Sequence, residues 1–303
     1  MTKQRTTQSL FQVYCALTKI KLSLLVVMSA AVAFVMASEL GIDWMTFLWT
    51  AVGTTLSAAA AATWNQLFER KRDAKMPRTK NRPIPSGRIS TLHAFVVGVL
   101  LTYGGLSVLG LGANLAAAAV SLCTILMYVF VYTPLKPRTT FNTFIGAIVG
   151  ALPPLLGWAA AVGTLTSGAW IFAGILFLWQ IPHFLALAWR YKDEYEHGGF
   201  TMLPSVDHSG ELTGRVSVLT ALCLVPLCLL FTSEGVTTQF FAISGSILSL
   251  WFTYVSFKFW LNPNNTTAMK MFLTSILYLP LLFICMLLSR QYVDFSETVL
   301  VPL

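Results

Sequence analysis

The stretch NQLFERKRDAKMPRTKNRPIPSGR, residues 65–88, is the densest cluster of charge in the chain and begins at the end of a long apolar run. It holds two carboxylates, Glu69 and Asp73, among eight lysines and arginines. Asn65, Glu69 and Asp73 recur every four residues, so on a helix they form one stripe. An amide and two carboxylates on one stripe can hold a hard divalent cation, and neighbouring cations can hold its anion. The stretch therefore predicts a magnesium–diphosphate site at a membrane surface.

Composition indicates a membrane protein. Of the 303 residues 56% are hydrophobic and only 11% are charged, whereas soluble domains carry about 25% charged residues. Several uncharged apolar runs are long enough to cross a bilayer. The net charge of +8 does not indicate nucleic-acid binding, because the cations lie in short segments between apolar runs, where membrane topology explains them. The five cysteines form no CxxC pair and are predicted to be small buried thiols.

The apolar runs predict nine membrane-spanning helices in one integral-membrane domain, residues 1–303. The expected spans are residues 22–38, 44–68, 91–111, 115–131, 141–162, 169–189, 216–231, 240–259 and 268–288. With the N-terminus inside, every lysine and arginine except Arg290 falls on the cytoplasmic side. The outer segments contain the acidic residues Glu39, Asp43, Glu234, Asp294 and Glu297. The positive-inside rule thus predicts a cytoplasmic tail at residues 1–20, which has no signal-peptide pattern, and an outer tail at residues 290–303.

A second charged stretch, RYKDEYEH at residues 190–197, follows the sixth expected span. Like the first stretch it starts at the cytoplasmic end of a helix and mixes acids with bases. On its own it reads as an ordinary charged cytoplasmic loop. If it faces the first stretch, Asp193 and Glu194 would complete a site for one or two magnesium ions that bridge a diphosphate.

Two further motifs leave alternatives open. The short inner loop YTPLKPRTTFN, residues 132–142, carries Lys136 and Arg138, which either anchor the topology or bind phosphate. The run WQIPHF, residues 179–184, places a glutamine and His183 inside an expected span. Polar residues in a span are costly and suggest a cavity, so His183 either contacts a buried substrate or is a hydrogen-bonded packing histidine.

Together these stretches resemble the UbiA superfamily of intramembrane prenyltransferases, and within it the branch that farnesylates heme. The resemblance runs in order through N65xxxE69xxxD73xxxxR78TxxR82P83, Y132TPLK136PR138T, G146xxxG150AxxP153P154xxG157W158, W179QIPH183F, and K192DEY195 ending at M202LP204. Two positions depart from the family pattern. Lys19-Ile20-Lys21 stands where the family suggests Lys-Pro-Arg, and Glu194 stands where paired aspartates are common.

The resemblance implies an all-α UbiA-type bundle of nine transmembrane helices with a cytoplasmic-facing site. It implies that the farnesyl group of farnesyl diphosphate moves to a vinyl group of heme b with addition of water, giving heme O and diphosphate for heme–copper terminal oxidases. The implied partners are these substrates, the lipid bilayer of a bacterial inner membrane, and heme A synthase or a terminal oxidase during assembly, with no nucleic acid.

The resemblance also implies roles for particular residues. The implied catalytic residues are Asn65, Glu69 and Asp73. The implied ligands of Mg²⁺ are Asn65, Glu69, Asp73, Asp193 and Glu194. The implied diphosphate-binding residues are Arg70, Arg78, Arg82, Lys136, Arg138, Arg190 and Lys192. His183 is the candidate heme contact.

Two other functions remain open on the residues alone. The first is a UbiA-type enzyme that prenylates an aromatic acid or a quinone precursor. The second is a transporter of an organic anion, for which charges near the middle of the membrane would be expected. The charges of this chain lie instead at one face of the membrane, which favours an enzyme.

Overall fold

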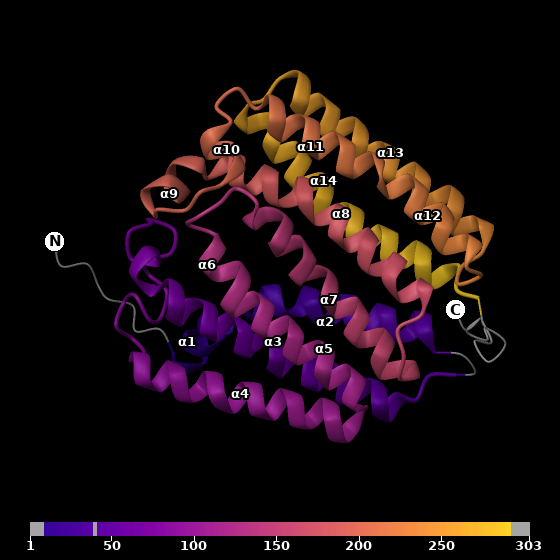
Figure 1. The fold of residues 1–303 in the computed structure, drawn as a ribbon, viewed down its shortest axis with the longest axis horizontal. Coiled ribbons are helices and arrows are strands. Elements are labelled where there is room, and N and C mark those ends of the chain that lie inside the picture. Colours follow the sequence, from indigo (N-terminus) through magenta and orange to yellow (C-terminus); the bar gives the residue numbers. More distant parts are fainter. Residues whose placement is uncertain (1–8, 39–40, 292–303) are drawn as a thin grey trace, which may run out of the picture.

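The described residues, 9–38 and 41–291, form a bundle of helices in this computed structural model (Figure 1). Nine helical segments of this described part are long and apolar enough to cross a membrane. They are α2 (Ile20–Ala37), α3 (Trp44–Asp73), α4 (Thr91–Gly112), the segment Leu115–Leu135, α7 (Asn142–Val162), α8 (Ser167–Arg190), the segment Glu211–Ser233, α13 (Gln239–Leu261) and α14 (Asn265–Leu288). The predicted all-α fold and its nine spans are confirmed.

Two of the nine segments are interrupted. Leu115–Leu135 consists of α5 (Leu115–Leu126), a π-helical stretch η1 (Met127–Tyr132) and α6 (Thr133–Leu135). Glu211–Ser233 divides into α11 (Glu211–Leu222) and α12 (Leu224–Ser233). The second break lies just before Pro226, which has no N–H to donate to the carbonyl of Leu222 four residues earlier. π-helical turns are rare and often lie at functional sites, and η1 is separated from Lys136 only by the three residues of α6.

The main core lies where α2, α7, α8 and α14 meet, with α12 and α13 packed against it. Trp158, Phe172 and Tyr278 are among its fully buried side chains. A Cβ atom on Gly157 of α7 would lie 1.9 Å from the carbonyl oxygen of Ala30 in α2. Only glycine permits this approach of two helix backbones, the close contact that small residues provide in membrane bundles.

Helix α3 is longer than the expected span and carries the charged stripe beyond the apolar region. Asp43 caps its first turn by accepting hydrogen bonds from the backbone N–H groups of Met45 and Thr46. The helix then continues to Asp73, with Arg70, Lys71 and Arg72 in its last turn. Cations at a helix C-terminus are stabilised by the helix dipole.

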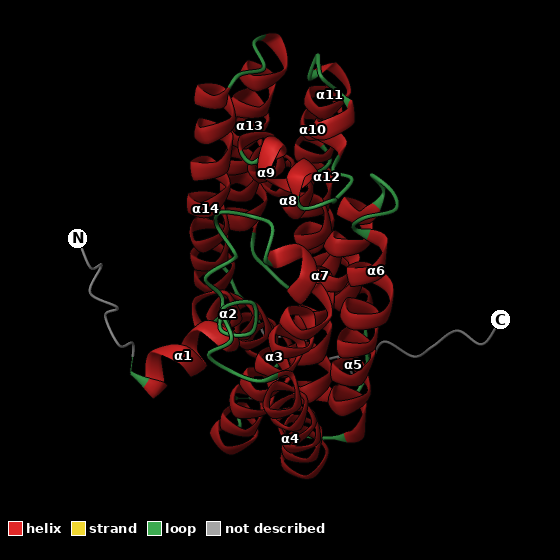
Figure 2. Ribbon diagram, turned by 90° about the vertical axis from the view of Figure 1, so that its left-hand side faces the viewer, coloured by secondary structure: helices red, strands yellow, loops and turns green. Residues whose placement is uncertain are grey.

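A short helix, α1 (Leu10–Leu17), precedes the first span and lies at the same end of the bundle as α6 and α9 (Lys192–His197) (Figure 2). Its first turn is closed by a capping box between Ser9 and Gln12. Part of the segment expected to be a tail, residues 1–20, is therefore helical. Residues 1–8 and 292–303 and the outer charges expected at Glu39, Asp294 and Glu297 lie outside the described residues.

Candidate active site

The three polar side chains of the α3 stripe each contact a cation from another part of the chain. Lys19 Nζ donates to Asn65 Oδ1 over 2.7 Å, and Lys136 Nζ lies 2.9 Å from Glu69 Oε1. Arg82 Nη1 donates to both carboxylate oxygens of Asp73, at 2.8 and 2.7 Å. Asn65 and Asp73 are 0% exposed and Glu69 is 4% exposed. The stripe predicted from the sequence is thus a buried row of oxygen donors surrounded by positive charge.

Local structure explains how the three cations reach α3. Lys19 has φ +49°, a left-handed conformation that turns the chain between α1 and α2. Lys136 directly follows α6, at the end of the π-helical segment. The loop after α3 folds back because Thr79 Oγ1 donates to the carbonyl oxygen of Asp73 over 2.8 Å, which brings Arg82 next to the same residue.

Helix α1 is bound to the stripe from the other side. Gln66, which is fully buried, donates from Nε2 to the carbonyl oxygens of Ala16 and Leu17, both at 2.8 Å. These carbonyls belong to the last turn of α1, where intrahelical partners are missing. Gln66 therefore fixes the segment that ends at Lys19 next to Asn65.

The two charged loops meet, as predicted. The backbone N–H of Arg78 donates to Glu194 Oε2 over 3.2 Å, and Arg78 Nη2 donates to the Tyr195 hydroxyl over 3.1 Å. The Arg78 guanidinium also lies 4.7 Å from the centre of the Tyr191 ring, a cation–π contact. Glu194 and the two tyrosines belong to the stretch after α8, so both loops line one end of the bundle.

The loop after α6 closes the third side of this end. Thr201 N donates to the carbonyl oxygen of Lys136 over 2.9 Å, and Asn142 Nδ2 donates to the carbonyl oxygen of Thr201 over 2.7 Å. The Lys136 ammonium lies 4.5 Å from the centre of the Tyr132 ring. Lys136 is therefore held between the second loop, the Tyr132 ring and Glu69.

The other predicted phosphate ligands lie farther out on the same end. Arg138 and Arg190 are exposed. Lys192 lies over the Trp189 ring, 4.9 Å from its centre. Arg70 is half-buried and donates to a backbone carbonyl of its own helix, that of Leu67.

The second-loop carboxylates do not join the α3 carboxylates in this conformation. Asp193 is exposed, and Glu194 accepts the Arg78 bond described above. Within the described ranges no group of three or more histidine, cysteine, aspartate or glutamate side chains lies close enough to hold a metal ion. A metal set centred on α3 would therefore use the amide oxygen of Asn65 together with Glu69 and Asp73.

Burial and neighbouring charges shift the pKa values of two lysines at the membrane edge, Lys19 and Lys136. Burial, followed by the charges of Arg82 and Lys136, lowers the pKa of Lys19 to about 7. Burial also disfavours the charged form of Lys136, but the Glu69 carboxylate outweighs it and raises the pKa of Lys136 above the ordinary lysine value. Lys136 is therefore firmly cationic, whereas Lys19 is half-protonated near neutral pH. Lys19 is not among the site residues predicted from the sequence, although it stands in a motif that departs from the family pattern.

His183 packs between α8 and α14. Its ring stacks on Trp179, with centres 5.3 Å apart, and on Phe272, with centres 5.0 Å apart. His183 Nδ1 shares a 2.7 Å hydrogen bond with Ser275 Oγ. Trp179 Nε1 donates to the carbonyl oxygen of the same serine. Nδ1 is thus occupied within the protein, in line with the packing alternative, and the ring lies on the face of α8 that packs against α14.

A central cavity of about 250 Å³ opens beside the stripe and extends into the bundle. Lys19 and Tyr132 lie at its charged end. Its walls are mainly small or apolar and come from α2, α3, α5, α7 and α8; they include Val26, Ala58, Ala61, Ala62, Ile125, Gly146, Val149, Gly150, Pro153 and Phe184. Pro153 is one of the wall residues, and α7 continues as a helix through Pro153 and Pro154.

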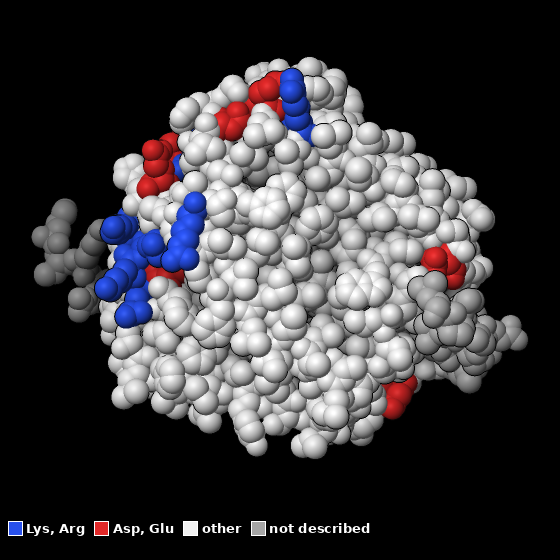
Figure 3. All heavy atoms as spheres, viewed as in Figure 1, with Lys and Arg blue, Asp and Glu red and all other residues white. Residues whose placement is uncertain are grey.

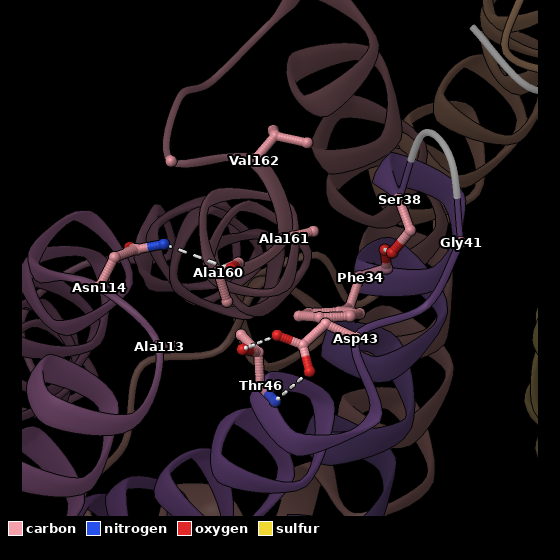
Figure 4. Close-up of a pocket in the computed structure, with 11 residues that line it drawn as sticks. Phe34, Ser38, Gly41, Asp43, Thr46, Ala113, Asn114, Ala160, Ala161 and Val162 are labelled. Atoms are coloured by element: carbon pink, nitrogen blue, oxygen red, sulfur yellow. Dashed lines mark hydrogen bonds between the residues drawn. The ribbon is translucent and has the colours of Figure 1, made fainter.

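The surface charge agrees with this location. In Figure 3 the blue lysine and arginine side chains gather at the end where α9 lies and where the loop after α3 turns back. A second pocket, of about 520 Å³, lies at the opposite end of the bundle (Figure 4). Its one charged lining residue is Asp43, whose carboxylate caps α3 and bonds Thr46. That pocket therefore lacks the charge an anion site requires.

Comparisons of sequence agree with the resemblance stated above. The model of the UbiA prenyltransferase family matches residues 26–284. A Solibacter usitatus protein named protoheme IX farnesyltransferase is 40% identical over 286 residues, covering 91% of this chain and 98% of that protein. A human protein named mitochondrial protoheme IX farnesyltransferase is 40% identical over 275 residues, covering 91% of this chain and 61% of that protein.

Comparisons of structure show the same fold at low sequence identity. A solved structure described as digeranylgeranylglyceryl phosphate synthase has a TM-score of 0.78 at 18% identity and covers 92% of this chain and 98% of its own. A UbiA homologue from Archaeoglobus fulgidus, solved with GPP and Mg²⁺ bound, has a TM-score of 0.64 at 16% identity and covers 90% of this chain and 99% of its own.

Proposed function

This chain belongs to the UbiA prenyltransferase family, and from that premise we propose that it transfers the farnesyl group of farnesyl diphosphate to a vinyl group of heme b. Water adds in the same reaction, and the products are heme O and diphosphate. The observation that carries the proposal is the buried Asn65–Glu69–Asp73 stripe, whose residues each contact a cation. One of these cations, Lys19, also lines a mainly apolar cavity. The names of the relatives support heme b as the acceptor.

The stripe fits a hard divalent cation. Asn65, Glu69 and Asp73 offer oxygen atoms on one face of a rigid helix, the donor type that Mg²⁺ prefers. Two of the three are carboxylates, and all three are buried. When bound, Mg²⁺ would neutralise diphosphate oxygens and make diphosphate a better leaving group. Asp193 and Glu194, in the neighbouring loop, are the additional candidate ligands.

The cations around the stripe would hold the diphosphate. Lys136 contacts Glu69, and Arg82 contacts Asp73. A rotation of either side chain would therefore be enough to contact a diphosphate bound next to the stripe. Donors already oriented toward developing charge lower the barrier without further reorganisation. Arg78, Arg70, Arg138, Arg190 and Lys192 are outer candidates, and Lys19 joins them at the cavity mouth.

The cavity would protect the reacting allylic carbon from water. An allylic cation reacts with any water that reaches it, so exclusion of solvent directs it to the acceptor. The small and apolar wall residues leave room for the isoprenoid chain among the helices. Heme b would approach from the membrane, with its propionates near the surplus cations at the charged end. His183, on the α14 side of α8, is the candidate heme contact.

The protein is a multi-pass membrane protein, and we place it in a bacterial inner membrane with its N-terminus in the cytoplasm and its C-terminus outside. The stripe, both charged loops and α1 would then face the cytoplasm, where a soluble prenyl diphosphate is available. Heme O made there would serve heme–copper oxidases, with heme A synthase or the oxidase as assembly partners.

Heme O formation tests the proposal directly. Membranes that contain the protein, given heme b, farnesyl diphosphate and Mg²⁺, are expected to form heme O, measured by liquid chromatography and mass spectrometry. Membranes without the protein are the control. Supplying 4-hydroxybenzoate beside heme b tests the aromatic-acid alternative, because farnesylated benzoate in place of heme O would assign the acceptor to that class.

Chelation tests the divalent cation. Excess EDTA is expected to stop heme O formation, and added Mg²⁺ to restore it. Full turnover in EDTA would remove Mg²⁺ from the proposal. Release of diphosphate only when heme b is present would also exclude the anion-transporter alternative.

A further inference from the structure

Thr54, Ser57, Ser121 and Leu156 are the residues that line the central cavity at the end farthest from Lys19 and Tyr132, and we call this end the cavity floor. We propose that the cavity floor selects the donor by length, accepting three isoprene units and rejecting four. This inference rests on the proposed function in one respect only, that the cavity holds the prenyl chain.

The depth of the cavity matches a farnesyl chain. On α3 the lining residues run from Ala62 to Thr54, which at 1.5 Å per residue is about 12 Å, and Asn65 of the stripe lies a further three residues along the helix, so the stripe and the floor are about 16 Å apart. On α7, Gly146 at the charged end and Leu156 at the floor are ten residues apart, or about 15 Å. An extended isoprenoid chain advances roughly 5 Å per unit at ordinary bond lengths. Three units fill this depth and a fourth does not fit.

A cross-helix hydrogen bond closes the α3–α5 side of the floor. Ser121 Oγ of α5 donates to Ser57 Oγ of α3 over 2.8 Å, and both residues are buried. A Cβ atom on Gly105 of α4 would lie 2.5 Å from the same Ser57 Oγ atom. Because α4 and α5 both pack closely against Ser57, a longer chain cannot displace this side chain without disturbing both helices.

The α7 side of the floor is part of the packed core. Leu156 is 3% exposed and forms a buried cluster with Phe34, Leu109 and Ala160. Leu109 in turn lies against Gly53, where a Cβ atom would come within 2.6 Å. Cores at native packing density do not yield to an extra group without strain. The α7 side of the floor is therefore stiff as well.

The floor carries the hydroxyl groups of Thr54, Ser57 and Ser121. Thr54 is 2% exposed, and its Oγ1 has no hydrogen-bond partner within the described residues. A chain that ends above these groups leaves them undisturbed. A longer chain would press hydrocarbon against hydroxyl groups and separate Ser57 from Ser121, which would leave buried polar groups unpaired.

Two substitutions move the floor in opposite directions. Leu156→Ala deepens the cavity, and Ser121→Leu fills its end. Two control variants change neighbouring positions on the same helices. Ile148→Ala is on α7, and Cys123→Leu is on α5; both residues are exposed on the outer surface and do not line the cavity.

The readout is donor binding, measured as the thermal shift of the purified full-length protein with Mg²⁺ and the thiolodiphosphate analogues of geranyl, farnesyl and geranylgeranyl diphosphate. It needs no acceptor, so a wrong assignment of heme b leaves the result valid. Wild type is expected to bind the farnesyl analogue at least about tenfold tighter than the geranylgeranyl analogue, the discrimination that a hydrophobic pocket gives. Leu156→Ala is expected to remove this preference, and Ser121→Leu to favour the geranyl analogue by a similar factor.

The outcomes separate the two proposals. Length selection by the cavity floor would be overturned if wild type bound the farnesyl and geranylgeranyl analogues equally well. It would also be overturned if the folded floor variants kept the wild-type ratio of affinities for these analogues. The proposal would also be overturned if Ile148→Ala or Cys123→Leu changed the ratio of affinities as much as the floor variants do, because those two side chains do not line the cavity. Length-dependent binding together with no heme O formation would retain the floor and overturn the acceptor.

Discussion

At the scale of single residues, the site is a set of buried charges that neutralise one another. Glu69 and Asp73 are carboxylates in a nearly solvent-free environment, and each is paired with one cation from a different loop. Removing one partner of a buried pair leaves an uncompensated charge, which costs about 3–5 kcal/mol. The same pairs would exchange carboxylate for phosphate when a metal-bound diphosphate enters. Stability and activity are therefore coupled at these positions.

The variants Glu69→Gln and Asp73→Asn test the stripe. Each keeps the shape of its side chain and removes one anionic ligand, so kcat/KM for farnesyl diphosphate is expected to fall about 10³-fold, the scale of losing one oriented electrostatic contact. The measurement is the initial rate of heme O formation by protein that elutes as folded. Glu211→Gln is the control, because its pair with Arg215 is half-exposed on both sides and worth little. Near-normal rates in both stripe variants would contradict the metal role.

Lys19 predicts a pH dependence. Its pKa of about 7 means that the free enzyme loses this cation as pH rises through neutrality. Because an anionic donor binds better to the protonated form, kcat/KM for farnesyl diphosphate is expected to fall above pH about 7, since that ratio reports ionisations of the free enzyme. The arginine in Lys19→Arg stays charged over the whole pH range, so the fall of kcat/KM above pH about 7 should disappear in this variant. If kcat/KM falls in the same way in Lys19→Arg, the pH dependence belongs to another ionisable group.

At the scale of elements, the site depends on how helix ends are held. Gln66 holds the last turn of α1, and the π-helical segment delivers Lys136. On the far side of the second loop, α10 (Leu203–Val206) leads to α11. Asp207 accepts hydrogen bonds from the backbone N–H and the hydroxyl of Thr213, at 2.7 and 2.8 Å. Asp207 thus caps the first turn of α11 and fixes the exit of this loop.

Asp207→Ala tests this cap. Loss of a side-chain cap typically costs about 1 kcal/mol, so the thermal midpoint of the purified protein is expected to fall by a few degrees. Burial favours the neutral acid, but the Thr213 hydrogen bonds outweigh it and lower the pKa of Asp207. The stability that the ionised Asp207 contributes is therefore fully present above the ordinary aspartate pKa. It is lost as pH falls through the lowered pKa of Asp207 in the folded protein. Wild type and variant should converge in acid. Glu196→Ala, an exposed residue in α9, is the control and should match wild type at every pH.

At the scale of the whole molecule, charge is polarised along the bundle. The described lysines and arginines other than Arg290 lie toward the end of the bundle that holds the stripe. In Figure 3 blue side chains gather at that end and red ones appear at the opposite end. By the positive-inside rule we propose that the stripe end faces the cytoplasm. An anionic substrate would therefore approach the site through a positively charged surface. An apolar product would leave between the surrounding helices into the membrane.

Cysteine labelling tests this orientation. In a variant without its five native cysteines, Ser86→Cys lies in the loop after α3 and Ser233→Cys lies at the end of α12. A membrane-impermeant maleimide added to intact spheroplasts is expected to label Ser233→Cys at once and Ser86→Cys only after lysis. The reverse pattern would place the site outside.

Much of this protein could be predicted from patterns local in the chain. Nine apolar runs, the spacing of Asn65, Glu69 and Asp73, and the distribution of lysine and arginine need only the bilayer thickness and the period of the helix to be interpreted. The meeting of the two charged loops followed from their shared side of the membrane, and the contact between Arg78 and Glu194 confirms it. These features are local because a membrane restricts each span to a helix.

Contacts between distant residues required the folded structure. The pairing of Lys19, Lys136 and Arg82 with one side chain each of α3 depends on a left-handed turn, a π-helical segment and a folded-back loop. No spacing in the sequence encodes those distances. His183 could not be assigned from its position in a span, since the stacking on Trp179 and Phe272 joins α8 to α14. The depth and floor of the cavity likewise arise where five helices meet, because packing of non-adjacent helices, and not the order of residues along any one of them, determines where space remains.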